Sequence, residues 1–425
     1  MGKRPKIRFN GFTDDWEQRK LSDIADKAVD NRGKTPTISE DGTHPLLEVA
    51  SLGNGTPDYS KVSKYLSDET FEDELRAYIK EGDILFSTVG SIGLVSLMDN
   101  NENAAIAQNI VAFRANEKYD AKFLYAMLST EDNQYKAQRI VMGAVQPSIK
   151  VSQLVDVEYG VTDNKEEQCK LGGYFLNLDN LITLHQRKGD ELTKLKNTML
   201  QKMFPQKGKK QPEIRFAGFT DDWEQRKVGE FYDFKNGLNK GKDFFGTGTP
   251  IVNFTDVFHN RGLYEENLKG KVTLEPSEIK NYEVKKGDIF FTRTSETIEE
   301  IGYPSVMLDT AENTVFSGFV LRGRCYQSED PLDDLFKKYV FFTNMFRAEM
   351  LKKSSMTTRA LTSGTAIKNM EFQFPSSKEE QHSIGEYLTS LDHLITLHQR
   401  KCDHLKTLKK FMLQNMFPSG KQKGE

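Results

Sequence analysis

The chain has 425 residues, with 59 Lys and Arg against 62 Asp and Glu, a formal net charge of −3. The length allows two or three domains, and the charge excludes a uniformly basic DNA-binding domain, so nucleic-acid contacts would need focused positive groups or a basic partner. The chain lacks an apolar run near the roughly 20 residues of a membrane helix and a signal peptide, and its three scattered cysteines fit a reducing compartment, which together predict a cytoplasmic protein.

The chain opens on a segment that is written twice. The sequence IRFNGFTDDWEQRK at 7–20 returns with one change at 214–227, and the two copies contain both tryptophans of the chain, Trp16 and Trp223. An internal repeat decides architecture before other features do. This repeat predicts two half-chains of similar build.

The residues from about 7 to 161 are predicted to form a globular α/β unit. Strand-like runs at 84–88 and 94–98 flank the turn sequence GSIG at 90–93. Residues 120–139 carry apolar side chains at helical spacing, which predicts a helix.

The second half repeats this pattern loosely. The sequence GDI at 287–289 matches GDI at 82–84 and opens a predicted strand at 289–292, and residues 334–353 are again predicted to be helical. The loops between these elements are not similar in the two halves.

A predicted long helix closes each half. The sequence LDNLITLHQRK at 178–188 returns as LDHLITLHQRK at 391–401, and both helices begin with Lys-Glu-Glu-Gln and close on Met-Phe-Pro. Apolar residues recur at three- and four-residue steps, which favours a coiled coil between the two copies; pairing with helices of another protein is the alternative. The predicted pairing residues are Leu178, Ile182, His185, Leu192, Leu391, Ile395, His398 and Leu405.

The order of these elements predicts an α/β (α+β) fold with two globular domains separated by two long helices that pair as an antiparallel coiled coil. The two domains would then lie at opposite ends of a rod, related by a pseudo-twofold axis. The predicted segments are a first globular domain (1–162), a first shared helix (163–205), a linker (206–212), a second globular domain (213–375), a second shared helix (376–418) and a tail (419–425).

The sequence lacks the motifs of several enzyme classes. No P-loop and no Asn/Asp-Pro-Pro-aromatic motif of a DNA amino-methyltransferase is present, and Glu283-Val284-Lys285 is a bare E-x-K without the upstream acidic residue of a nuclease. His398 and Cys402 could share a helix face and bind a metal. The first copy has Gly189 in place of Cys402, which favours a histidine at a helix interface, so we predict no metal site.

The repeated segments carry a resemblance to a known family. The Gly-Phe-Thr-Asp-Asp-Trp-Glu-Gln-Arg-Lys segment, the Lys-Glu-Glu-Gln helix start and the Leu-Ile-Thr-Leu-His-Gln-Arg-Lys helix resemble the specificity subunit of type I restriction-modification systems, of the Gram-positive kind, over the whole chain. The resemblance implies two target recognition domains, a non-catalytic reader of double-stranded DNA, two modification subunits that use S-adenosylmethionine, and two restriction subunits that use ATP and Mg. It implies no cofactor in this chain.

Two readers on a rod would recognise two half-sites with an unread gap. A helix of roughly 35 residues is about 50 Å long at 1.5 Å per residue, and allowing for the width of the domains this predicts half-site centres about one DNA turn apart. Because the two domains differ in sequence, the target should be asymmetric.

Base contacts are expected in the divergent loops, since the shared segments cannot encode two different sequences. Arg, Gln and hydroxyl side chains can read base edges, although a phosphate contact or a solvated loop is the alternative for each of them. The candidates are Thr88, Ser91, Gln146, Ser148, Lys150, Arg293, Thr294, Thr358, Arg359 and Ser363.

Three other functions stay open at this point. A specificity subunit of a related, non-type-I restriction-modification system would have the same sequence features. A single-chain restriction-methylation enzyme would need the motifs that are missing, and a pure scaffold would have no need of two diverged domains.

Overall fold

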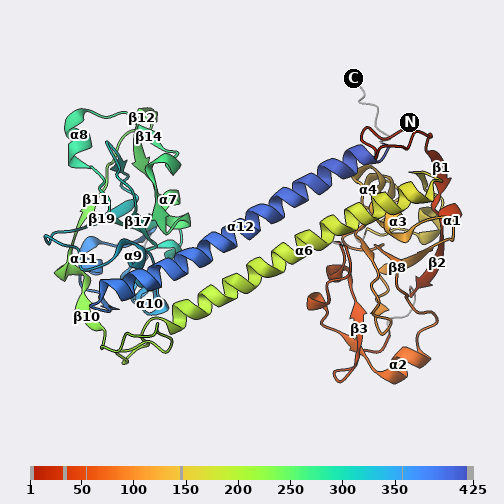
Figure 1. The fold of residues 1–425 in the computed structure, drawn as a ribbon, viewed down its shortest axis with the longest axis horizontal. Helices are drawn as coiled ribbons and strands as arrows, with labels where there is room; N and C mark the ends of the chain where they lie inside the picture. Colours follow the sequence, from red (N-terminus) through yellow and green to blue (C-terminus); the bar gives the residue numbers. More distant parts are fainter. Residues whose placement is uncertain (1–3, 32–35, 54, 144–146, 357, 419–425) are drawn as a thin grey trace. The chain divides into compact units, whose positions relative to one another are not determined.

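The computed structural model describes residues 4–31, 36–53, 55–143, 147–356 and 358–418. The chain divides into two compact units, one of residues 1–188 with 398–425 and one of residues 189–397. Each unit therefore contains one globular domain and parts of both long helices, α6 (Lys165–Lys202) and α12 (Lys378–Met416) (Figure 1). Because this division cuts both helices, the six predicted segments stay a prediction.

The first unit is built on a four-stranded antiparallel sheet in the order β2-β8-β5-β6, of which β2 and β8 are labelled in Figure 1. Strands β5 and β6 and most of β8 bury side chains on both faces, whereas the edge strand β2 has exposed charged residues. The strands of the unit are β1 (Glu17–Lys20), β2 (Ala25–Asp30), β3 (His44–Leu47), β4 (Tyr65–Leu66), β5 (Ile84–Ser87), β6 (Val95–Leu97), β7 (Ala105–Ile106), β8 (Ile110–Ala115) and β9 (Glu158–Val161). Its short helices are α1 (Leu21–Ile24), α2 (Asp68–Asp73), α3 (Ala121–Leu128), α4 (Glu131–Gln138) and α5 (Val151–Leu154).

The second unit has a five-stranded sheet in the order β11-β19-β15-β17-β13. Its strands are β10 (Glu224–Lys227), β11 (Tyr232–Asn236), β12 (Phe245–Val252), β13 (Gly262–Leu263), β14 (Lys271–Val272), β15 (Ile289–Thr292), β16 (Thr294–Ser295), β17 (Pro304–Met307), β18 (Val315–Phe316), β19 (Val320–Cys325), β20 (Ser355–Met356), β21 (Ala360–Leu361) and β22 (Glu371–Phe374). Its short helices are α7 (Phe254–His259), α8 (Pro276–Asn281), α9 (Asp334–Val340), α10 (Asn344–Lys353) and α11 (Gly364–Lys368). The α+β fold is confirmed.

Two predicted helices are each broken in the middle. The segment 120–139 forms α3 and α4, and 334–353 forms α9 and α10. In both cases a threonine before the second helix caps its N-terminus: Thr130 accepts a hydrogen bond from the backbone N–H of Asn133, and Thr343 accepts one from Phe346. The sequence predicted one helix across each threonine, where the capping residue instead starts a new helix.

The two long helices pair in antiparallel fashion within each unit, as the sequence predicts. In the first unit, Asp179 pairs with Lys409, and His185 with His398. The residue number therefore rises along α6 as that of its partner falls along α12. In the second, Lys196 pairs with Asp392. The predicted pairing residues Leu178, Ile182, Leu192, Leu391 and Leu405 are buried, and His185, Ile395 and His398 are half-buried.

The helix start of each copy is held by the repeated segment of the same copy. The Arg8 guanidinium donates two hydrogen bonds to the buried carboxylate of Glu167, at 2.6 and 2.8 Å, and Arg215 does the same to Glu380, at 2.7 and 2.8 Å. The bond to Glu167 raises the pKa of Arg8, as the bond to Glu380 raises that of Arg215. A buried carboxylate is stable only when it is paired, so these bridges explain why the segment and the Lys-Glu-Glu-Gln start recur together.

The Met-Phe-Pro end of each helix packs on the tryptophan of the other copy. Phe417, at the end of the second helix, lies 5.7 Å from Trp16 and 5.9 Å from Phe123 between ring centroids. Phe204, at the end of the first helix, lies 5.9 Å from Trp223 and 5.6 Å from Phe336. Each globular domain is thus closed by the helix of the opposite repeat.

The His185 and His398 rings meet between the helices at matching positions of the repeat. Their Nδ1 atoms are 2.9 Å apart, so one ring must donate and the other accept, and the bond requires at least one neutral imidazole. Burial, together with His398 and Lys401, lowers the pKa of His185.

We expect the free energy of unfolding to fall as the pH drops below about 6.5. An unfolded histidine takes up its proton near that pH, whereas His185 with its lowered pKa does so only at lower pH in the folded state. Between the two values the unfolded chain binds more protons, so stability rises with pH. Urea unfolding at pH 7.5 and 5.5 measures the effect, and a His185→Gln variant with an unreduced pH difference would contradict it.

Candidate nucleic-acid interface

Divergent loops converge at one end of the sheet in the first unit. Strand β2 ends and β8 begins at this end, where Asp30 pairs with Val111, and β5 ends beside the start of β8, where Ser87 pairs with Ile110. The β5–β6 hairpin loop, the turn before β8 and the loop that precedes α5 meet here. We call residues 88–94, 107–109, 142–143 and 147–149 the first sheet-end surface.

The second unit has a matching surface at the corresponding end of its sheet. Asn236 at the end of β11 pairs with Leu321, and Thr292 at the end of β15 pairs with Val320. The small sheet β16-β21-β20 adds a further layer there. We call residues 237–240, 293–295, 317–319, 355–356 and 358–363 the second sheet-end surface.

The backbone of the two surfaces follows the same hydrogen-bond pattern. Thr88 N–H donates to Asn109 O at 2.9 Å, and Arg293 N–H donates to Phe319 O at 2.8 Å. The carbonyl oxygen of Thr88 accepts from the N–H of Ile149, and that of Arg293 accepts from Thr362. The pattern makes Thr88 and Arg293 equivalent positions, as it does Asn109 and Phe319. One backbone frame therefore presents different side chains in the two domains.

The structure brings three of the five candidates of the first domain together. Ser91 is exposed in the hairpin loop, and Ser148 forms a backbone bridge to Val89 in the same hairpin. Thr88 lies at the same place but is fully buried, and its hydroxyl faces the Asn109 carbonyl at 3.3 Å. A side chain enclosed in this way cannot reach a base, so Thr88 is not proposed as a base contact.

Lys150, another candidate of the first domain, lies apart from that cluster. Lys150 is exposed at the start of α5, where it lines an open hollow with Asp26 and Lys27. This position suits a phosphate contact better than a base contact. Gln146 falls outside the described residues.

All five candidates of the second domain lie on the second sheet-end surface. Thr294 is in β16 and pairs with Leu361 of β21, while Thr358 and Arg359 are exposed in the turn between β20 and β21. Ser363 follows β21 and caps α11 by accepting from the Ala366 N–H. Arg293 is half-buried and donates to the Gly318 carbonyl at 3.1 Å, so part of its guanidinium supports the neighbouring turn.

Sequence reasoning missed the turn before β8 and β19. In the first domain Gln108 is exposed and Asn109 half-buried, and at the matching place in the second domain Phe319 is 52% exposed. The signal was present as a polar pair between two apolar runs, AAIA and IVAF, but no turn residue such as Pro or Gly marked it in the first copy.

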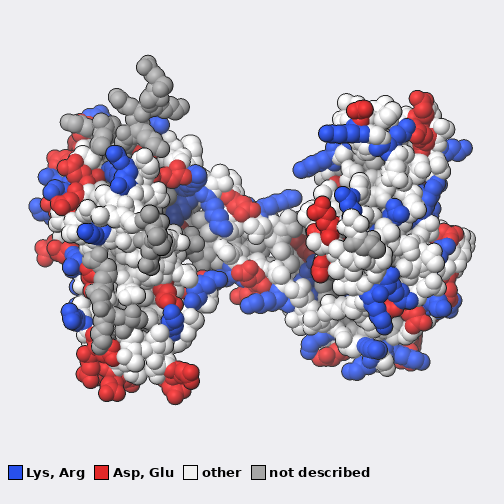
Figure 2. Space-filling view, turned by 180° about the vertical axis from the view of Figure 1, so that it is seen from behind, with Lys and Arg blue, Asp and Glu red and all other residues white. Residues whose placement is uncertain are grey.

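On the side drawn in Figure 2, basic and acidic side chains are interspersed over each unit. Acidic side chains gather at the end of the first unit that carries α2, which has the sequence DETFED. That end would repel a phosphate backbone, which leaves the sheet-end surface as the better candidate.

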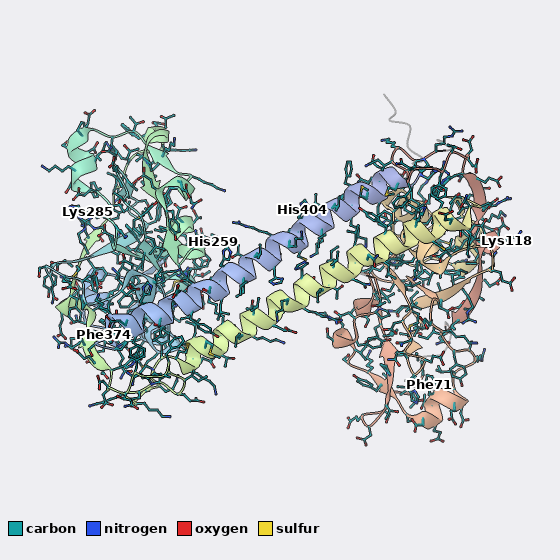
Figure 3. All side chains as sticks on the ribbon, viewed as in Figure 1. Phe71, Lys118, His259, Lys285, Phe374 and His404 are labelled. Atoms are coloured by element: carbon teal, nitrogen blue, oxygen red, sulfur yellow. The ribbon has the colours of Figure 1, made fainter. Side chains whose placement is uncertain are left out.

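The histidines of α12 do not form a metal site with Cys402. Cys402 is buried and faces the carbonyl of Ile182, while His398 faces His185. His404 is exposed on the same helix (Figure 3). Within the described part of the chain, no three His, Cys, Asp or Glu side chains are grouped so that they could hold a metal ion.

Among the same described residues, no helix has both the length and the apolar character needed to cross a membrane.

The chain matches one protein family and is similar in sequence to two specificity subunits. The profile of the family described as "Type I restriction modification DNA specificity domain" matches residues 13–194 and 220–407. The type I restriction enzyme MjaVIII specificity subunit of Methanocaldococcus jannaschii is 24% identical over 424 residues, which covers 96% of this chain and 93% of that protein. The putative type I restriction enzyme MjaX specificity subunit of the same organism is 24% identical over 441 residues, with 98% and 96% covered.

A solved structure has a similar fold. The crystal structure of the type I restriction-modification system S subunit from M. genitalium aligns with a TM-score of 0.61 at 15% identity, over 98% of this chain and 100% of that one.

Proposed function

Because the chain belongs to the family of the type I restriction modification DNA specificity domain and is a specificity subunit of a type I restriction-modification system, we propose that its two sheet-end surfaces read the two halves of an asymmetric DNA target. Subunits of this family are non-catalytic. In this proposal the chain recognises double-stranded DNA and positions two modification subunits and two restriction subunits. We also propose that the restriction-modification system is of the Gram-positive kind.

The observation that carries the proposal is the shared backbone frame with different side chains. Asn109 and Phe319 occupy one equivalent position, in turns that make matching backbone hydrogen bonds in the two domains. Sequence readout requires specific donors, acceptors and apolar groups at fixed places. Two domains that fix the backbone alike and vary the groups are suited to read two different short sequences.

Individual contacts follow from the chemistry of the exposed groups. Arg359 can donate two hydrogen bonds to a guanine, while Ser91, Ser148, Thr294 and Thr358 can pair with base edges or phosphates. Lys150 is proposed as a phosphate contact. Cofactors are expected on the partners only: S-adenosylmethionine on the modification subunits, and ATP and Mg on the restriction subunits.

The helices offer a surface for the modification subunits. Leu184 is 61% exposed in the first unit, and the matching Leu397 is 52% exposed in the second, each preceded by an exposed leucine three residues earlier, Leu181 and Leu394. Residues three apart share a helix face, so each unit presents a short apolar stripe in the shared sequence. We propose that each stripe binds one modification subunit in the same way.

We expect Leu184→Asp and Leu397→Asp together to weaken the modification complex without unfolding the chain. A charge on an apolar binding stripe must be desolvated on association, whereas in the free chain it stays in water. The measurement is co-purification of the modification subunit and size-exclusion mass of the complex. The control is Gln186→Asp together with Gln399→Asp, which adds the same two charges at matching exposed positions. The stripe is not the docking surface if the complex survives the double leucine substitution.

Methylome sequencing tests the proposed function. A host that expresses this chain with its modification partner should methylate one asymmetric, two-part sequence, and the same host without this chain should not. A methylated target that does not depend on this chain, or methyl transfer from labelled S-adenosylmethionine by the purified chain alone, would refute the proposal. The latter result would favour the single-chain enzyme.

A further inference from the structure

We propose that Phe319 is a base-reading residue of the second domain that contacts the 5-methyl group of a thymine. This inference rests on the proposed function, because it assigns one residue to one kind of base. Phe319 lies in the turn before β19, where the sequence predicted no base contact.

The turn that carries Phe319 has a fixed backbone. The Ser317 N–H donates to Val252 O, and the Gly318 N–H donates to Leu238 O. From the other side, Arg293 donates its backbone N–H to Phe319 O and its side chain to Gly318 O. A Cβ at position 318 would lie 2.1 Å from Asn239 Oδ1, so the glycine also allows the close approach of the neighbouring loop.

On this fixed backbone the Phe319 side chain is presented to solvent. Phe319 is 52% exposed, whereas the residues on either side, Gly318 and Val320, are buried. An exposed aromatic ring held on a rigid turn costs little entropy to order on binding. The second sheet-end surface also carries exposed Met356, Leu361 and Arg359. A small apolar centre with a basic neighbour suits a base edge flanked by phosphates.

The exposed fraction of Phe319 distinguishes two ways in which an aromatic ring contacts DNA, which are insertion between base pairs and contact with a base edge. A wedge is inserted between base pairs, whereas about half of the Phe319 surface is covered by the protein. The exposed part of the ring is apolar, and an apolar group is what contacts a thymine methyl in the major groove.

The equivalent position in the first domain explains why the two domains would differ here. Asn109 occupies it with its side-chain oxygen buried, next to the exposed Gln108. The amide of Gln108 can donate to and accept from an adenine edge, whereas a phenyl ring can only make apolar contact. The same turn would therefore read a different feature in each half-site.

The experiment uses the purified complex of the full chain with its modification subunits and duplexes that carry the target defined by methylome sequencing. Each thymine of the second half-site is replaced in turn by deoxyuridine, which removes only the methyl group. At one position we expect affinity to fall about fourfold, the fold-change that corresponds to one buried methyl group of about 0.8 kcal/mol. Phe319→Ala should bind the two duplexes equally, and Phe319→Leu should retain part of the difference.

Tyr326→Ala is the matched control. Tyr326 is 55% exposed and follows the opposite end of the same strand, β19, so its truncation should leave the thymine-to-deoxyuridine ratio at the wild-type value. Wild-type insensitivity to every replacement, a second half-site without A·T pairs, or an unchanged ratio in Phe319→Ala would overturn the inference. A complex that binds its target no better than unrelated DNA would instead refute the proposed function.

Discussion

Truncation of Phe417 to alanine should lower the free energy of unfolding by about 3–5 kcal/mol, the usual result for a buried phenylalanine. Phe417 is 5% exposed and touches the rings of Trp16, Phe123 and Phe175, with centroids 5.7–5.9 Å apart. Its removal would leave a cavity at the point where the second helix closes the first globular domain. Urea unfolding followed by tryptophan fluorescence measures the effect, because Trp16 is itself part of the contact.

The same helix supplies the control for that measurement. Phe411 is 52% exposed, so Phe411→Ala should change stability by no more than about 0.5 kcal/mol. The internal repeat adds a second test, since Phe204→Ala should destabilise the second unit to a similar degree through Trp223 and Phe336. Equal effects of Phe411→Ala and Phe417→Ala would show that the Met-Phe-Pro ends do not close the domains.

The paired helices and the repeated frame could be predicted because a repeat reports shared structure directly. Each Arg–Glu bridge and each Phe–Trp contact joins two repeated segments, and both members are visible as repeats in the sequence. What the repeat could not show is which copies make contact. The crossed arrangement, in which Phe417 meets Trp16, depends on the antiparallel pairing of the helices.

The candidate site was predicted only in part because loops lack the regular spacing of apolar residues that marks helices and strands. The matching GDI sequences located β5 and β15, and from them the adjacent hairpins, which is why Ser91, Arg293 and Thr294 lie on the sheet-end surfaces. Burial within a loop has no comparable signature. Thr88 is polar in sequence but its hydroxyl is enclosed, whereas Phe319 is exposed although an aromatic residue next to a strand resembles core.

Exchange of residues 1–162 for the first domain of another family member should replace one half of the DNA target and leave the other half unchanged. The expectation follows from the separation of the two sheet-end surfaces, which lie in different compact units. Methylome sequencing of the chimaera gives the result, and a second chimaera with residues 213–375 exchanged should change only the other half.

The structure also says which donor domains should work in this exchange. The incoming domain must bind the helix of its own repeat as well as the end of the helix of the other repeat. It therefore needs an arginine for Glu167 and a tyrosine for Asp179 of α6, at the positions of Arg8 and Tyr125, and a tryptophan for Phe417 at the position of Trp16. Asp179 is buried and also pairs with Lys409, and loss of its partners would leave a buried charge at a cost of several kcal/mol. A donor that lacks these residues should give an unstable chimaera without methylation, whereas a donor that keeps them should give a stable one. If a stable chimaera shifted both half-sites together, the two domains would not read independently, and the assignment of one half-site to each sheet-end surface would be wrong.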